Sequence, residues 1–347
     1  MKKAIMVGAG GMAGHWVRHF LPDFRNRMEI VALVDVRPDP LKASGDFLEL
    51  SESRRFNTAA EAFEKVEADF CIIVVPPAFH AEGVQLASAR KMDILSEKPI
   101  ADTWAATVEI ARMARLAGVR MQVVQNYRYT PRVAAFRKAI QDGRIGRLNY
   151  LVSRFAADYR QRNAWGAFRH EIPHTLLIEG AIHHLDQLRN LAGADCRSIS
   201  GYEWRPEQES FDGEPCGLFT MAFTNETHGV YEGNCLEAGT QNSWYEEFYR
   251  AEGDDGALIL DRDHVVRLIR NHPGQAPHTE EIPLEPLPYE GHKAIIDQFL
   301  LWLEGGPTPP TAIEDNIKSA AMLFGAIQAS ETSRVVDVQA LVQEAQN

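Results

Sequence analysis

Cysteine is scarce in this chain, and the few cysteines are far apart. The 347 residues include four, Cys71, Cys196, Cys216 and Cys235. No two have the close spacing of a thiolate zinc site, and they provide no disulfide framework. We therefore expect reduced thiols and a cytoplasmic location.

Positive charge and long apolar runs are also in short supply. Lys and Arg number 36 against 48 Asp and Glu, a net charge of −12, so a nucleic-acid backbone is an unfavourable partner. No apolar run approaches the ~18 residues that cross a bilayer, so we expect no membrane association. The 45% of hydrophobic residues can fill two sizeable cores, and the length favours two domains.

The first third of the chain alternates between short apolar runs and helical patterns. The runs typical of buried strands are 3–8, 29–35, 70–75, 92–97 and 119–125. Helical patterns fill 12–21, 80–90 and 103–117 between them. This alternation predicts an α/β fold, with a doubly wound parallel sheet of the Rossmann type over residues 1–125.

A glycine-rich turn joins the first strand to its helix. The stretch GAGGMAG, residues 8–14, has the G-x-G-x-x-A spacing of a dinucleotide-binding turn. Gly8 permits the tight turn, Gly10 lets the backbone approach a pyrophosphate, and Ala13 allows the helix to pack closely on the strand. Gly11 and Met12 open the helix, whose N-terminus favours negative charge. We expect these residues to bind a dinucleotide.

An acidic residue follows the second strand at the position expected of a ribose ligand. Asp35 lies 21 residues beyond Gly14. A carboxylate there repels the 2′-phosphate of NADP, so the sequence favours NAD. Arg37 keeps NADP open, because a neighbouring arginine can accommodate that phosphate.

Titratable residues cluster around a further predicted helix in the middle of the chain. HEIPH, residues 170–174, fits the zinc-protease pattern, which requires both histidines on one established helix. Pro173 cannot occupy a helix interior but suits the first position, so we expect a helix from Pro173 to about Leu191. His170 then lies outside it and the zinc-protease interpretation fails. On that helix Glu179, His183, Asp186 and Asn190 share one stripe, with apolar residues on the other faces.

The order of these motifs resembles the glucose–fructose oxidoreductase and inositol dehydrogenase family (Gfo/Idh/MocA). The matching features over the first 190 residues are GAGGMA, Pro76 to His80, Glu97-Lys98-Pro99, Asn126-Tyr127-Arg128 with Pro131, DGRIGRL at 142–148, and the run from Glu179 to Asp186. The resemblance implies cofactor contacts from Pro76, His80, Glu97, Lys98 and Asn126. It also implies that Lys98, Glu179 and His183 act on a substrate hydroxyl, with Arg128 on the substrate side. Glu179 stands where the family has aspartate.

The expected chemistry is oxidation of a secondary alcohol. A histidine titrates near neutrality, so His183 is the natural general base, and Glu179 one turn earlier could orient it and stabilise its cation. Lys98 would stabilise the developing alkoxide. This reaction requires no metal, and we expect none.

The remainder, residues 126–347, predicts a second α+β domain. Runs at 148–159, 217–227, 228–238, 244–253 and 257–269 indicate an open, mostly antiparallel sheet, followed by helices at about 291–304 and 312–329. The resemblance implies that this domain binds substrate and forms a homodimer or homotetramer.

One segment of the second domain is basic. Residues 147–174 carry five arginines against two acids, with Tyr159 and Trp165 interleaved: Arg147, Arg154, Arg160, Arg162 and Arg169, against Asp158 and Glu171. One hypothesis is that Arg160, Arg162, Arg169 and Trp165 line a sugar site for an anionic substrate. Solvated arginines, or arginines paired across a subunit contact, explain the pattern equally well.

These observations favour an NAD(P)-dependent oxidoreductase for a secondary hydroxyl of a sugar, sugar acid or cyclitol. One alternative is a glycosidase that uses NAD transiently, through oxidation, elimination and reduction. Another is a non-catalytic dinucleotide sensor. NADH accumulation separates the first from the second, and an effect of Lys98→Ala on turnover separates both from the third.

Overall fold

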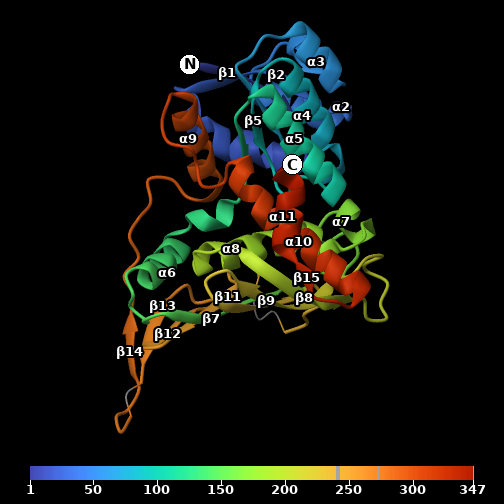
Figure 1. Ribbon diagram of the computed structural model, residues 1–347. Coiled ribbons are helices and arrows are strands. Elements are labelled where there is room, and N and C mark those ends of the chain that lie inside the picture. Colours follow the sequence, from blue (N-terminus) through green and yellow to red (C-terminus); the bar gives the residue numbers. More distant parts are fainter. Residues whose placement is uncertain (240–242, 272, 347) are drawn as a thin grey trace. The chain divides into compact units, whose positions relative to one another are not determined.

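The computed structural model describes residues 1–239, 243–271 and 273–346. Its contacts divide the chain into two compact units (Figure 1). The first unit contains residues 1–126, 289–317 and 345–347, and the second contains 127–288 and 318–344. Residues 289–317 and 345–347 thus group with the N-terminal third, whereas the sequence assigned all of 126–347 to one domain. As folding domains, the ranges 1–125 and 126–347 remain a prediction.

The first unit is built on a six-stranded parallel sheet, in the order β3-β2-β1-β4-β5-β6. The strands are β1 Lys2–Val7, β2 Met28–Val34, β3 Arg55–Phe56, β4 Phe70–Ile73, β5 Asp93–Ser96 and β6 Met121–Val123. The helices between them are α1 Met12–His15, α2 Pro38–Phe47, α3 Ala59–Lys65, α4 His80–Ala89 and α5 Trp104–Ala117. The predicted Rossmann sheet is confirmed, with the short β3 added.

A distant segment completes the first unit. Helix α9 (Gly291–Leu303) is held by Arg27, whose Nη1 lies 2.6 Å from Asp297 Oδ1 and whose Nη2 lies 3.0 Å from Glu304 Oε2. The backbone N–H of Val123 at the sheet edge donates to Thr311 O at 3.0 Å. Residues 289–317 therefore belong to this unit.

The second unit is built on a nine-stranded sheet, in the order β14-β13-β12-β11-β7-β10-β9-β8-β15. Among the described strands of this sheet, only β7 and β10 pair in parallel, which confirms the predicted mostly antiparallel sheet. The strands are β7 Leu148–Ala156, β8 Cys196–Trp204, β9 Cys216–Phe223, β10 His228–Asn234, β11 Phe248–Gly253, β12 Gly256–Leu260, β13 Val266–Arg270, β14 His278–Glu281 and β15 Val336–Asp337. The single strand predicted for 257–269 is wrong, because a turn in which His264 has a φ of 62° separates β12 from β13.

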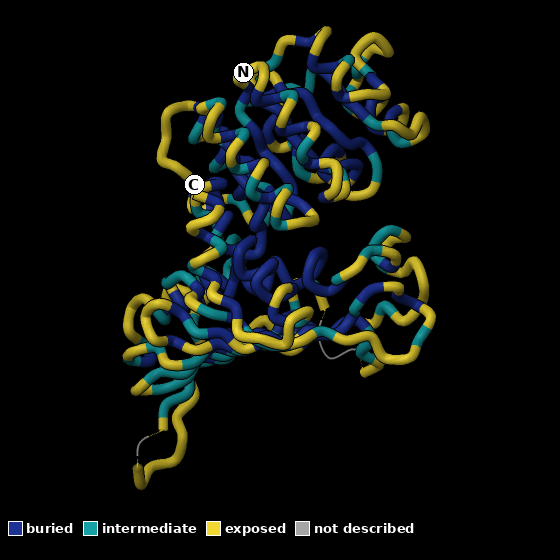
Figure 2. Tube along the Cα trace, turned by 45° about the vertical axis from the view of Figure 1, so that its right-hand side comes forward, coloured by how far each residue is buried: buried dark blue, intermediate teal, exposed yellow. Residues whose placement is uncertain are grey.

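Helices accompany this sheet. They are α6 Pro131–Gln141, α7 Ala167–Glu171, α8 Ile182–Ala192, the part of α10 (Ile313–Thr332) from residue 318 on, and most of α11 (Val338–Gln346). Helix α8 packs against β7 and β10. Figure 2 shows buried chain through the core of each unit, and residues 273–279, which lead into β14, are exposed. Within the described ranges, no helix is both long enough and apolar enough to cross a bilayer.

The helix expected from Pro173 begins later than predicted. His174 has a left-handed φ of 51°, and the helix opens with a π-helical segment, Leu176–Ala181, that continues into α8. A tertiary contact overrides the local preference of proline for the first helical position, because the His174 N–H donates to Glu214 Oε2 at 3.0 Å. The helix ends as predicted, at Gly193 with a φ of 62°. Residues 175–189 are all buried, as its apolar faces predict.

Candidate cofactor and substrate sites

Every residue predicted to bind the cofactor lies at one edge of the parallel sheet. The glycine turn follows β1, Asp35 and Arg37 follow β2, Pro76 and His80 follow β4, Glu97 and Lys98 follow β5, and Asn126 follows β6. The carboxyl ends of parallel strands meet at one edge, where open α/β sheets bind their ligands. The topology therefore gathers all of these residues within the first unit.

The glycine turn leaves no room for a side chain at Gly8, where backbone lies close. Gly8 has a φ of 109°, and a Cβ at this position would lie 2.1 Å from Val74 O. A Cβ at Gly10 would lie 2.2 Å from Arg37 Nη2. Ala13 is fully buried, whereas Met12 is exposed. The turn thus has the close-packed, open-backbone form that suits a pyrophosphate.

Asp35 is tied to the glycine turn. Its Oδ2 accepts hydrogen bonds from Ala9 N at 2.9 Å and Gly10 N at 3.1 Å, and its Oδ1 accepts from Arg37 N at 2.9 Å. The Asp35 side chain is 9% exposed, while that of Arg37 is 64% exposed. A carboxylate fixed beside the turn is placed to accept hydrogen bonds from a ribose and to repel a phosphate.

Glu97 is the centre of a buried network that the sequence did not indicate. Trp16 Nε1 donates to Glu97 Oε1 at 2.9 Å, and His292 Nε2 lies 3.3 Å from the same oxygen. Burial alone would raise the pKa of Glu97, but the hydrogen bond and charge of His292, the charge of Lys98 and the hydrogen bond from Trp16 lower it overall. The carboxylate therefore stays ionised and anchors the turn that presents Lys98. His292 is nearly 200 residues away in sequence, so no local pattern could identify it.

The other predicted cofactor residues differ in exposure. His80 is fully buried, with its two ring nitrogens 3.1 Å from Ile100 O and 2.9 Å from Val75 O, so it braces the turns after β4 and β5. Asn126 is also buried, Lys98 is half-buried and Pro76 is exposed. Lys98 is thus partly open to solvent at the end of its strand.

In the second unit, the two predicted catalytic residues on the central helix are buried. His183 is 7% exposed, and its ring stacks on Tyr127 with centroids 4.4 Å apart. Glu179 is 3% exposed and lies in the π-helical segment, where its Oε2 accepts from Arg169 Nε at 2.7 Å. Segments of π-helix are rare and often occur at functional sites. An imidazole and a carboxylate are therefore held four residues apart in a largely desolvated setting.

Asp186, which lies on the same stripe of the helix as Glu179 and His183, has a structural role. Asp186 forms a buried ion pair with Arg128, at 2.5 Å and 2.7 Å, and accepts from Ser319 Oγ at 2.7 Å. Next to His183, His184 is fully buried and stacks on Phe155 and Tyr231. Arg128 is thus engaged by Asp186, although the sequence suggested it for the substrate.

Aromatic side chains surround the segment with Glu179 and His183. Trp165 stacks on Tyr159 with centroids 5.0 Å apart and lies against Trp244 at 5.4 Å. A Cβ at Gly180 would lie 3.6 Å from Trp165 and 3.7 Å from Trp244, so both indoles pack over this glycine. Sequence reasoning identified Trp165 but not Trp244, which lies on a separate loop.

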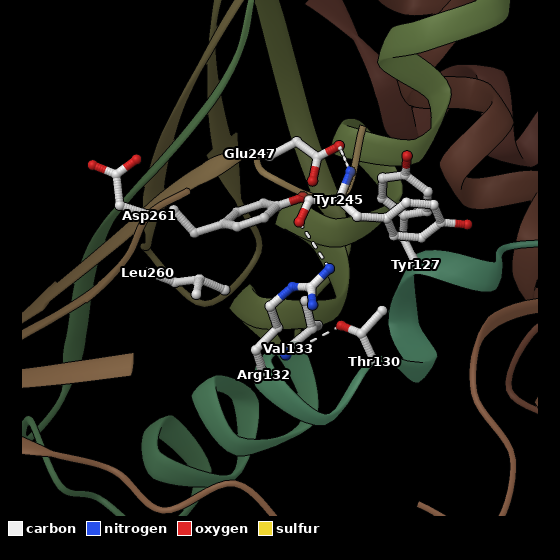
Figure 3. A pocket seen from close by; sticks show the side chains of 9 residues that line it. Tyr127, Thr130, Arg132, Val133, Tyr245, Glu247, Leu260 and Asp261 are labelled. Atoms are coloured by element: carbon white, nitrogen blue, oxygen red, sulfur yellow. Dashed lines mark hydrogen bonds between the residues drawn. The ribbon is translucent and has the colours of Figure 1, made fainter. Parts of the chain in front are cut away.

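Tyr127 is supported from behind by a polar network (Figure 3). It stacks on Tyr245, whose N–H donates to Glu247 Oε1 at 3.0 Å and whose carbonyl accepts from Arg132 Nη2 at 2.7 Å. The hollow between these residues measures about 10 Å³, room for one water at most. The hollow is therefore too small to hold a sugar. The residues around it instead support Tyr127, on which the ring of His183 stacks.

The predicted substrate arginines fall into two groups. Arg160 pairs with Asp158 at 2.8 Å and Arg162 with Asp212 at 2.9 Å, both at exposed positions. Arg169 instead reaches Glu179, and its guanidinium also lies over the ring of Trp165. Of these three, Arg169 is the one that contacts the predicted catalytic segment.

Comparison with known families gives a consistent result over most of the chain. Residues 2–125 match the family described as "Oxidoreductase family, NAD-binding Rossmann fold", and residues 133–259 match "GFO/IDH/MocA C-terminal domain". An uncharacterised protein, y4oX of Sinorhizobium fredii, is 39% identical over 98% of this chain and 97% of its own length. A D-apiose dehydrogenase of Paraburkholderia graminis is 26% identical over 99% of this chain and 91% of its own length.

Solved structures share the fold over the whole chain. An oxidoreductase from Agrobacterium radiobacter, crystallised with NAD+, L-tartaric acid and magnesium, has a TM-score of 0.86 at 20% identity and covers 98% of this chain and 99% of its own. The WlbA dehydrogenase of Bordetella pertussis, crystallised with NADH and UDP-GlcNAcA, has a TM-score of 0.81 at 19% identity, covering 97% and 98%.

Proposed function

The chain belongs to the Gfo/Idh/MocA oxidoreductases and has an NAD-binding Rossmann domain, and from this premise we propose that it oxidises a secondary hydroxyl of a sugar, sugar acid or cyclitol. The observation that carries the proposal is the buried pair Glu179 and His183, which a protein that only binds a dinucleotide has no need to maintain. When bound, NAD accepts a hydride from the substrate carbon. The residues of this chain supply placement and proton transfer.

His183 takes the hydroxyl proton in this mechanism. An imidazole works as a general base near neutral pH, and the flat stack on Tyr127 fixes the plane of the ring. Glu179, four residues earlier, provides a negative charge that stabilises the imidazolium. Arg169 holds the Glu179 carboxylate in place and prevents it from rotating away.

Lys98 stabilises the developing alkoxide. Its turn is fixed by Glu97, whose Oε2 accepts the Lys98 N–H at 3.2 Å while Oε1 is bound by Trp16. An ammonium held by such a rigid turn requires little reorganisation as negative charge develops on the substrate oxygen. We propose that Lys98, Glu179 and His183 act on the same hydroxyl.

The aromatic residues around Gly180 support a sugar substrate. Flat indole and phenol faces at Trp165, Trp244 and Tyr159 suit the apolar face of a sugar ring, and carbohydrate sites combine such faces with a few polar groups. The similarity to a D-apiose dehydrogenase supports the same substrate class. For the cofactor, Asp35 favours NAD over NADP.

The test is a spectrophotometric screen for NADH formation across neutral sugars, uronates, sulfosugars and inositols. With an active substrate, we expect Lys98→Met and His183→Asn each to lower kcat by about 10²- to 10⁴-fold. The matched controls are Lys65→Met on α3 and His228→Asn on β10, which alter exposed side chains and should leave kcat unchanged.

The double variant Lys98→Met/His183→Asn tests whether the residues act together. Residues of one catalytic unit are strongly non-additive, so the double variant should lose little more than either single variant. Full turnover in both single variants would refute the assignment. Release of a product sugar without NADH accumulation would instead favour the redox-neutral glycosidase.

A further inference from the structure

His174 lies in a cluster of carboxylates that the proposed reaction does not use. Its Nδ1 is hydrogen-bonded to Glu203 Oε1 and lies 3.7 Å from Glu214 Oε2. Its Nε2 lies 3.6 Å from Glu331 Oε1. Among the described residues, the ion pairs formed by these three glutamates lead only to His174 and to no lysine or arginine. Three carboxylates therefore share at most one positive charge.

The second carboxylate oxygen of Glu203 gives independent support for a cation site. The Glu203 side chain is only 2% exposed. Its Oε2 is buried and makes no hydrogen bond within the described structure. A buried carboxylate oxygen without a partner is destabilising, and native structures rarely contain one without a specific reason.

The backbone is shaped to bring these residues together. Gly213 packs so tightly on the loop before the central helix that a Cβ there would lie 2.2 Å from Ile172 O and 3.2 Å from His174 N. The left-handed φ of His174 turns its N–H onto Glu214, the next residue after Gly213. Glu203 comes from β8 and Glu331 from α10, so three other segments converge on the imidazole of His174.

We propose that His174, Glu203 and Glu214 bind a divalent cation of the zinc class. One ligand atom from each of the three lies within 4.8 Å of those of the other two. Zinc ligands at about 2.0–2.2 Å from the ion stand roughly 3.3–3.6 Å apart. The Glu214 carboxylate, 3.7 Å from His174 Nδ1, is already close to that spacing, while the hydrogen-bonded atoms of His174 and Glu203 would move apart. Imidazole nitrogen together with carboxylate oxygen is a zinc-type ligand set, whereas magnesium and calcium prefer oxygen alone.

The cation would replace the proton that His174 Nδ1 and Glu203 share. It would also satisfy Glu203 Oε2 and offset the surplus negative charge, with water as a fourth ligand. Its role is structural, because it would join β8 and the loop before β9 to the segment that begins the helix carrying Glu179. No local spacing in the sequence could indicate this site, because its three ligands lie 29 and 11 positions apart.

The experiment is metal titration of the full-length chain after treatment with a chelator. We expect ZnCl₂ to bind at one site per chain in isothermal titration calorimetry and to raise the melting temperature by several degrees. Glu203→Gln and His174→Gln should each weaken the affinity by about 100-fold or more. Glu207→Gln, an exposed change of the same kind on the neighbouring loop, should bind zinc as the parent does. MgCl₂ should produce no comparable shift.

Further measurements separate loss of zinc binding from loss of folding and locate the bound ion. Circular dichroism of the metal-free variants verifies that lost binding does not reflect unfolding, and anomalous scattering at the zinc edge locates the ion in crystals of the parent. No saturable binding by the parent, equal binding by Glu203→Gln, or an ion located elsewhere would overturn it. The NADH screen is independent, so the two proposals fail separately.

Discussion

Replacement of Asp35 by asparagine tests how this chain selects its dinucleotide. The carboxylate is 9% exposed and accepts three backbone N–H groups, from Ala9, Gly10 and Arg37. Asparagine keeps the shape but has one acceptor oxygen and a donor amide. The amide must then face a backbone N–H, so we expect a loss of stability of about 1–3 kcal/mol.

The larger effect concerns the 2′-phosphate of NADP. Two unit charges 4 Å apart interact with about 4 kcal/mol at an effective dielectric constant of 20, and the phosphate carries almost two charges. Solvent screening and small movements reduce this repulsion, and about 3–4 kcal/mol is a conservative value. Because 1.4 kcal/mol corresponds to a factor of ten, Asp35→Asn should shift the ratio of NADPH to NADH affinity by about 10²- to 10³-fold.

The assay is fluorescence titration of the pure protein with NADH and with NADPH, which requires no knowledge of the sugar. The ratio of the two dissociation constants removes any general loss of folded protein. Asp39→Asn on α2 is the matched control, since it changes the same charge at an exposed position. In the Asp35→Asn background, Arg37→Ala should weaken NADPH binding specifically. An unchanged ratio in Asp35→Asn would refute the electrostatic reasoning.

Three further outcomes are expected. Glu97→Gln should lower the melting temperature at neutral pH, because it weakens the links to Trp16 and His292. The pKa of Glu97 lies below its ordinary value of 4.5, so this carboxylate stabilises the fold above pH 4.5, and the difference between parent and variant should shrink as the pH falls below it. Gly8→Ala should abolish NADH binding in the same titration, since its Cβ would meet a backbone oxygen at 2.1 Å. Trp165→Ala should raise KM for the active sugar about tenfold or more with a smaller change in kcat, while an unchanged KM would remove this indole from the sugar site.

The parallel sheet could be predicted from the sequence because its strands are buried on both faces. Runs such as the one from Phe70 to Ile73 are apolar throughout and end in breakers, which leaves little ambiguity. The antiparallel sheet is harder, since half of its positions face outward. The polar turn after Leu260 is short enough to be mistaken for the outward-facing residues of one long strand. The short β15 has too few residues to produce any pattern.

At the candidate sites, sequence-based prediction is limited by contacts between residues that are far apart in the chain. The glycine turn and Asp35 could be found because their chemistry depends on local spacing. Glu97 with His292, and His174 with Glu203, are long-range pairs that no window of sequence contains. The predicted start of the central helix was wrong for the same reason. The hydrogen bond from His174 N–H to Glu214 outweighs the local preference of Pro173 for the first helical position.

In the basic segment, residues 147–174, ion pairs with acidic residues leave fewer arginines available for a substrate than their number suggests. Five arginines against two acids suggested an anion site, yet Arg160 and Arg162 each already have an acidic partner at the surface. Arg169 donates Nε to Glu179 and Nη1 to Trp165 O, and a guanidinium has five donors. Its remaining N–H groups could hold a substrate carboxylate without releasing Glu179. An acidic sugar bound in this way would bring a second negative charge next to Glu179, and together the two charges would favour the protonated form of His183. In the proposed reaction, anion recognition and general-base strength would therefore be coupled through Arg169.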